Sequence, residues 1–139
     1  MAQVRTVNIA WTVVYTTGTA EQVCFHPMTS WMPAAQLAAA RASYELRCAD
    51  TNCEVRPVVQ MADEVDGSFS EFTAVAGAGE HWTAGDGITY PTGGFADMAT
   101  DSAKKQIARL GFETRLKSGG SQPAFARLAA KLEIQTCGG

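Results

Sequence analysis

The chain contains four cysteines, whose thiols can form disulfides, bind a metal ion or stay free, depending on their neighbours. Cys48 and Cys53 are separated by residues 49–52, and apolar and polar residues alternate on both sides of that loop. The pattern predicts a β-hairpin with the two thiols opposite each other on its apolar face. Cross-strand neighbours lie about 4.5–5.5 Å apart at Cα, which is within reach of a disulfide. The alternatives are two free thiols packed as small apolar groups, and a zinc site.

A zinc site would add Cys24 and His26 to that pair. The Cys-x4-Cys spacing departs from the Cys-x2-Cys of common structural zinc sites, so we predict no metal centre and no cofactor. Cys137 lies in the tail 136–139. It is predicted to be idle in a reducing medium, or to bridge to Cys24 or to another chain after oxidation.

A second group of reactive residues lies in a glycine-rich stretch, where His81 and Trp82 come shortly before Asp86 and Tyr90. A histidine beside a carboxylate is typical of acid–base catalysis. No nucleophile elbow, paired-carboxylate motif or His-x3-His accompanies it, so we predict that the protein is not an enzyme. Trp82 and Tyr90 are instead candidates for a sugar-binding surface or a protein interface. Trp31, between two methionines, is predicted to be a core plug or an interface anchor.

The elements that must position these residues are mostly strands. Alternation of period two, rich in β-branched and aromatic residues, predicts five clear strands. They cover 7–15, 42–48, 53–61, 109–116 and 124–135. In the first of them period-two alternation places Val7, Ile9, Trp11, Val13 and Tyr15 in one phase, and Asn8, Ala10, Thr12 and Val14 in the other. Shorter strands are expected at 21–25 and 69–76, and an alanine-rich segment predicts a short helical turn at 33–40.

Two further expectations concern how the strands pair. Pro57 cannot donate a backbone hydrogen bond, which predicts an edge strand or a bulge there. The two C-terminal strands, joined by the flexible residues 117–121, are predicted to form an antiparallel hairpin. The absence of a βαβ rhythm predicts one mainly β domain over 1–139, an antiparallel β-sandwich or jelly roll with a long glycine-rich loop at 77–94.

Composition excludes several classes of function. The formal net charge of −3 gives no basic surface for DNA or RNA, so nucleic acid is not an expected partner. No run of 18 apolar residues exists, so no membrane span is expected. The first residues enter a strand pattern directly, without a signal peptide, so we expect synthesis in the cytoplasm.

Three segments carry a resemblance to a known class of proteins: GDGITYPTGGFADM at 85–98, QIARLGFETRLKSGG at 106–120 and FARLAAKLEI at 125–134. The combination of antiparallel strands with a glycine-rich loop resembles the small β-sandwich decoration or cement proteins of tailed bacteriophage particles. The same segments are also similar to sugar-binding jelly rolls of secreted enzymes and phage tails.

The first resemblance implies a non-enzymatic structural component of the virion, which binds a major capsid or tail protein as repeated, self-associating copies. The second implies a carbohydrate-binding module that takes a glycan on its aromatic side chains.

Overall fold

The computed structural model describes residues 3–17, 22–47, 52–64, 69–72, 82–89, 96–97, 106–120 and 122–136. They form two antiparallel sheets. Sheet A contains β1 (Gln3–Tyr15), β10 (Phe125–Thr136), β4 (Leu37–Arg47), β7 (Gly87–Thr89) and β8 (Ala96–Asp97). Sheet B contains β2 (Cys24–Pro27), β3 (Met32–Pro33), β9 (Ile107–Leu116), β5 (Cys53–Ala62) and β6 (Phe69–Phe72). A 3-10 turn, η1 (Ala34–Gln36), joins β3 to β4.

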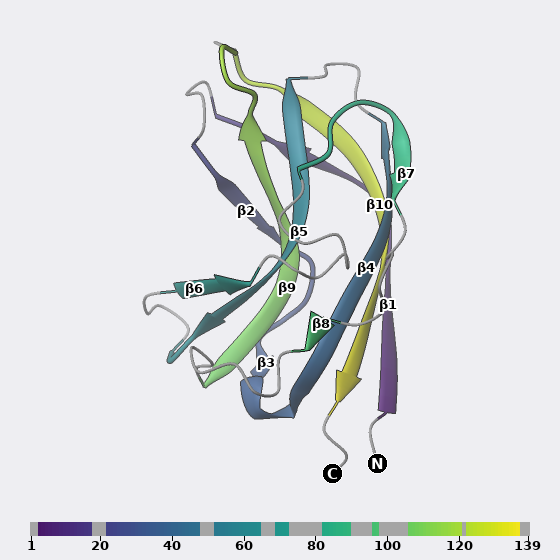
Figure 1. Ribbon diagram of the computed structural model, residues 1–139, viewed down its shortest axis with the longest axis vertical. Coiled ribbons are helices and arrows are strands. Elements are labelled where there is room, and N and C mark those ends of the chain that lie inside the picture. Colours follow the sequence, from purple (N-terminus) through teal and green to yellow (C-terminus); the bar gives the residue numbers. More distant parts are fainter. Residues whose placement is uncertain are drawn as a thin grey trace.

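The strand pairs are nested along the chain (Figure 1). β1 pairs with β10, β2 and β3 pair with β9, β4 pairs with β7 and β8, and β5 pairs with β6. The chain is therefore one long hairpin, with its tip between β5 and β6. Rolling this hairpin brings β10 beside β4 and β9 beside β5, which closes the two sheets. This is the strand order of a jelly roll, so the predicted fold class is confirmed.

The core lies between the sheets. Sheet A contributes buried apolar side chains, among them Leu37, Tyr44, Leu46, Leu128 and Leu132, and sheet B contributes Val55, Val59, Met61, Leu110, Phe112 and Leu116. The rings of Tyr44 and Phe112 meet edge to face across the gap, with centroids 5.2 Å apart. Within the described residues, no helix is long and apolar enough to cross a membrane.

All five predicted long strands are present, extended or trimmed at their ends by up to five residues. The helical turn predicted at 33–40 is confined to η1, because Leu37 already begins β4 and buries its side chain between the sheets. The short strand expected at 21–25 appears as β2 at Cys24–Pro27. Pro57 lies in an interior strand rather than an edge strand. On the edge of β5 that faces away from β9, Val55 bridges to Thr83, and pairing with β6 starts only at Val59. Pro57 lies between these two contacts, so no described strand requires a hydrogen bond from its backbone nitrogen.

Both predicted hairpins are wrong in their pairing. β4 and β5 belong to opposite sheets, and Cys53 lies opposite Leu116 of β9. Cys48 lies outside the described residues. β9 and β10 likewise belong to opposite sheets. Each of these strands buries its apolar face against the other sheet and does not pair with its neighbour in the sequence.

The unbroken alternation predicted for 7–15 is interrupted within β1. Ile9 pairs with Ala130 and Thr12 pairs with Leu128, so Ala10 and Trp11 together face Ala129 alone. This is a β-bulge, in which two residues on one strand oppose one residue on its partner. The extra residue reverses the alternation, and apolar residues after the bulge turn from the core to the outer face of sheet A.

Candidate functional site

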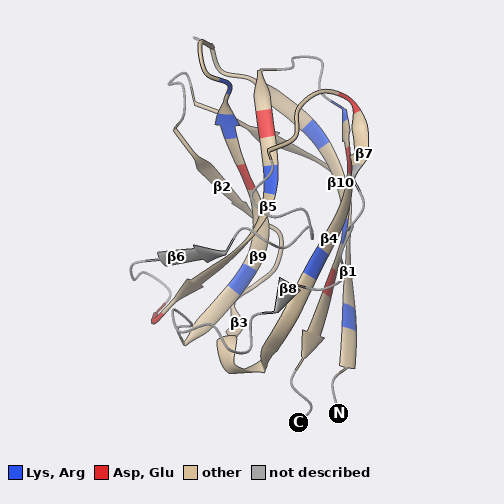
Figure 2. Cartoon of the chain, viewed as in Figure 1, with Lys and Arg blue, Asp and Glu red and all other residues tan. Residues whose placement is uncertain are grey.

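The outer face of sheet B carries four charged residues of alternating sign, Glu54, Arg56, Glu113 and Arg115, which we call the charge cluster. Glu54 is opposite Arg115 and Arg56 is opposite Glu113 in the β5–β9 register. Arg115 Nε donates to Glu54 Oε1 at 3.0 Å, and Arg56 Nη2 lies 2.7 Å from Glu113 Oε1. Figure 2 shows blue and red bands alternating along both strands. The Glu113 side chain is completely buried, so this pair is shielded from water.

Trp82 packs over the two arginines of the charge cluster. Its ring centroid lies 4.3 Å from the guanidinium carbons of both Arg56 and Arg115. The next residue, Thr83, fixes this position through reciprocal backbone hydrogen bonds with Val55 of 2.8 and 2.9 Å. The half-buried Trp82 ring is thus held over the charge cluster by two cation–π contacts.

Trp31 makes the corresponding contact further along the same face. Its ring centroid is 4.3 Å from the guanidinium carbon of Arg109, which also lies 5.0 Å from the Phe25 ring. Arg109 Nε donates to Gln60 Oε1 at 2.8 Å, and burial lowers the pKa of this guanidinium below its ordinary value. The structure therefore brings the predicted residues Trp31 and Trp82 onto one face, each stacked on arginine. Tyr90 lies outside the described residues.

The outer face of sheet A carries the apolar residues that the bulge in β1 exposes. Trp11, Val13 and Tyr15 are 44, 55 and 58% exposed, and Phe125, opposite Tyr15, is 54% exposed. Arg127 lies among them, opposite Val13 and 5.9 Å from the Trp11 ring centroid. We call Trp11, Val13, Tyr15 and Phe125 the β1 patch.

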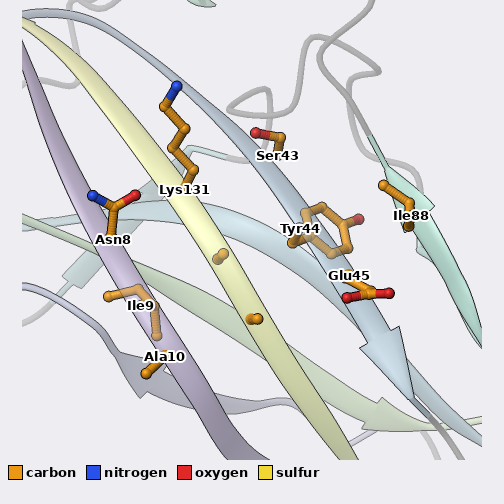
Figure 3. A pocket seen from close by; sticks show the side chains of 10 residues that line it. Asn8, Ile9, Ala10, Ser43, Tyr44, Glu45, Ile88 and Lys131 are labelled. Atoms are coloured by element: carbon orange, nitrogen blue, oxygen red, sulfur yellow. The ribbon is translucent and has the colours of Figure 1, made fainter.

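A shallow groove lies on the same face of sheet A, beside the β1 patch. Its sides come from Asn8 and Ala10 of β1, Ser43 and Glu45 of β4, and Ile88 of β7 (Figure 3). Alanines of β10 lie between them, and these small side chains leave the sheet surface low. The β1 patch and the groove form a continuous surface without a deep cavity, which suits contact with another macromolecule better than enclosure of a substrate.

An ion pair lies further along sheet A. Arg41 donates to both carboxylate oxygens of Glu133, at 3.0 and 3.1 Å. This hydrogen bonding lowers the pKa of Glu133 and raises the pKa of Arg41, each away from its ordinary value. The pair links β4 to β10 and is structural.

In the described part of the chain, no three His, Cys, Asp or Glu side chains cluster in a way that could hold a metal ion. Cys24 lies opposite Thr114, whereas Cys53 is buried opposite Leu116 on the other side of β9. Strands two apart are about 10 Å apart, too far for a disulfide between these two cysteines. Cys48 and Cys137 lie outside the described residues, so bridges through them stay predictions.

His26, considered above as a zinc ligand, instead ties the two sheets together at one end. Its Nε2 lies 3.0 Å from the carbonyl oxygen of Tyr15 and 3.3 Å from Thr114 Oγ1. Thr114 Oγ1 also donates to the Tyr15 carbonyl. The imidazole and the Tyr15 ring pack edge to face, with centroids 4.6 Å apart.

Comparison with solved structures finds this fold in viral particles. The crystal structure of the infectious bursal disease virus VP2 subviral particle aligns with 96% of the chain at a TM-score of 0.63 and 13% identity. The structure of the Gt strain of the same virus aligns with 96% of the chain at a TM-score of 0.59 and 14% identity, and the structure of the Gx strain aligns with 100% at 0.58 and 10% identity. At such identities the likeness establishes the fold alone. The chain spans about a third of the length of these proteins. No family model matches the sequence, and no curated protein sequence is similar to it.

The sequence interpretation selected Trp31 and Trp82 but missed the arginines that hold them and the whole β1 patch. One signal for the patch was available. The strand at 7–15 contains Val14 out of phase with its other large apolar residues, and that residue is fully buried. An apolar residue in each phase of one strand is compatible with a bulge between them.

Proposed function

We propose that the protein is a non-enzymatic structural subunit of a virus-like particle, of the decoration or cement type, that binds a capsid or tail lattice. The β1 patch carries this proposal. Three aromatic side chains of about 150–250 Å² each, half exposed beside Val13, leave on the order of 400 Å² of contiguous apolar surface in water. The largest apolar patch on a monomer is typically about 300–600 Å² and is often functional, so the size of the β1 patch is compatible with an interaction site.

The fold supports the same conclusion. Jelly rolls are common in viral shells, and solved structures of infectious bursal disease virus, among them its VP2 subviral particle, share this fold. Jelly rolls also occur in lectins and cupins, so the fold is compatible with the proposal without deciding it. The proposal places this chain in the virion, made in the host cytoplasm, with a major capsid or tail protein and further copies of itself as partners.

The direct test is the protein content of purified particles from the producing host. Quantitative mass spectrometry should find this chain in many copies per particle. Its absence from intact particles would contradict the proposal.

A pair of variants then tests the patch. Val13→Glu places a charge at its centre, and Val4→Glu makes the same change on the same strand, at 53% exposure and about 30 Å away along the strand. Val13→Glu should remain folded by circular dichroism but lose incorporation into particles at least tenfold, whereas Val4→Glu should incorporate normally. Equal incorporation of both variants would exclude the patch as the contact.

A carbohydrate-binding module is the second candidate. Two arginines hold the Trp82 ring in place, and a fixed half-buried ring is what sugar stacking uses. A glycan array with the wild type and Trp82→Ala tests this role. Binding that disappears in the variant would favour the module, and no binding by the wild type would exclude it.

Cysteine links between chains extend the main proposal. Cys24 on β2 and Cys137 in the tail are the candidates for bridges that form after release from the host. Particles run on gels without reductant should give bands of multiple chains that Cys137→Ser removes. Identical mobility with and without reductant would contradict this extension.

A further inference from the structure

A cavity of about 380 Å³ opens along one side of the sandwich, between the edge strand β1 of sheet A and the β2–β3 segment of sheet B. It does not overlap the β1 patch or the groove, and neither proposed contact uses it. β1 and the β2–β3 segment belong to different sheets, and His26 of β2 contacts β1 at Tyr15, the end of that strand far from Arg5 and Val7. The cavity leads from the surface toward the core beside these two residues.

A break in the edge of sheet B accounts for the opening. β2 ends at Pro27 and β3 starts at Met32, although both pair with β9. Between them, the Met28 and Thr29 amides both donate to the carbonyl of Leu110, at 2.9 and 3.2 Å. The Leu110 amide donates to Thr29 Oγ1 at 2.9 Å. A side chain thus replaces the backbone acceptor of a regular strand, and the chain leaves the ladder at this point.

The inner wall of the cavity is apolar. It is lined by Val7 of β1, Ile134 of β10 and Met32 of β3. Val7 and Met32 are partly buried against the core, and Ile134 is 3% exposed. An apolar chain placed against them would extend the existing core instead of requiring a separate surface.

The mouth of the cavity is polar. Among the described residues that line it, Arg5, two residues from Val7 along β1, is the only charged one. Ser30 and Gln36 add a hydroxyl and an amide from the opposite side, and Trp31 also lines the cavity. A cation with hydrogen-bond donors above an apolar wall complements an anionic head attached to an apolar tail.

We propose that this cavity binds a small amphipathic carboxylate, with its tail against Val7, Ile134 and Met32 and its head at Arg5. The site is independent of the proposed particle function. No covalent step is involved.

Decanoate titrated into the ¹⁵N-labelled protein tests the proposal, because the three tryptophans supply a built-in comparison. The indole N–H signal of Trp31, assigned through Trp31→Phe, should shift saturably. The signals of Trp11 and Trp82, which do not line the cavity, should not shift. Decyltrimethylammonium, with the same tail and the opposite charge, should bind at least tenfold more weakly.

Arg5→Gln should weaken decanoate binding about tenfold, through loss of a charge-assisted hydrogen bond. Arg47→Gln is the matched control, because that exposed arginine lies on β4 away from the cavity. The proposal fails if Trp31 does not shift, if all three tryptophans shift alike, or if the cationic amphiphile binds equally well. It also fails if Arg5→Gln and Arg47→Gln have the same affinity as the wild type.

Discussion

Replacing Arg56 by Met tests the charged face of sheet B most directly. Methionine keeps much of the apolar stem but removes the guanidinium that lies 2.7 Å from Glu113. The Glu113 side chain has no exposure to water, and that of Arg56 is 16% exposed. Removal of one partner of a buried ion pair costs about 3–5 kcal/mol, because the remaining charge stays desolvated.

The same substitution removes one of the two guanidinium contacts of Trp82. A cation–π contact contributes about 0.5–1 kcal/mol at an exposed site and more when shielded. We therefore expect a loss of about 4 kcal/mol, a large part of the roughly 5–15 kcal/mol that stabilises a typical domain. With a urea m-value near 2 kcal/mol/M, the midpoint of unfolding should fall by about 2 M.

Arg47→Met is the control. Arg47 pairs with Glu45 at 2.8 Å, but the two side chains are 53 and 28% exposed. Such surface pairs contribute about 0.2–1 kcal/mol, so the midpoint should move little. The double variant Arg56→Met/Glu113→Leu should recover most of the loss, because it leaves no buried charge. A loss below about 1 kcal/mol for Arg56→Met, or a double variant as unstable as the single one, would refute the reasoning.

Two other predictions concern packing and pH. A Cβ on Gly111 would lie 2.3 Å from the His26 carbonyl oxygen and one on Gly87 would touch nothing within 4 Å. Gly111→Ala should therefore cost at least about 3 kcal/mol in urea unfolding while Gly87→Ala costs less than about 0.5 kcal/mol, and equal costs would contradict the packing of β2 on β9. Arg41 lowers the pKa of Glu133, so the stability from this carboxylate is present above its unfolded pKa of about 4.3 and is lost as the pH falls through the lower folded value. Glu133→Gln should consequently be less stable than the wild type at pH 7 but equally stable at pH 2, and a difference that persists at pH 2 would contradict the assignment.

The sequence predicted the strands better than their partners, for a physical reason. Alternation reports that a strand such as 53–62 has one buried face, and it carries no information about which strand lies beside it. The loop at 49–52 suits a hairpin as well as it suits a crossing between sheets. In a jelly roll the partners are nested, so β1 meets β10 across more than a hundred residues of sequence.

The surfaces were predictable only in part. Trp31 and Trp82 stood out as aromatic residues outside the regular strand pattern, but their partners Arg109, Arg56 and Arg115 were interpreted only as the polar phase of strands. The β1 patch depends on one extra residue at the bulge. Without the bulge, the same strand would direct Trp11, Val13 and Tyr15 to the core face of sheet A.

The nested pairing also determines when the molecule can take shape during synthesis. β10 is made last among the described strands, yet it lies between β1 and β4 inside sheet A. Until β10 has been synthesised, β1 lacks the strand with which it pairs, and the β1 patch, which requires both Tyr15 and Phe125, does not exist. A nascent chain without β10 therefore cannot form this patch, and the proposed contact would become available only after β10 has been made.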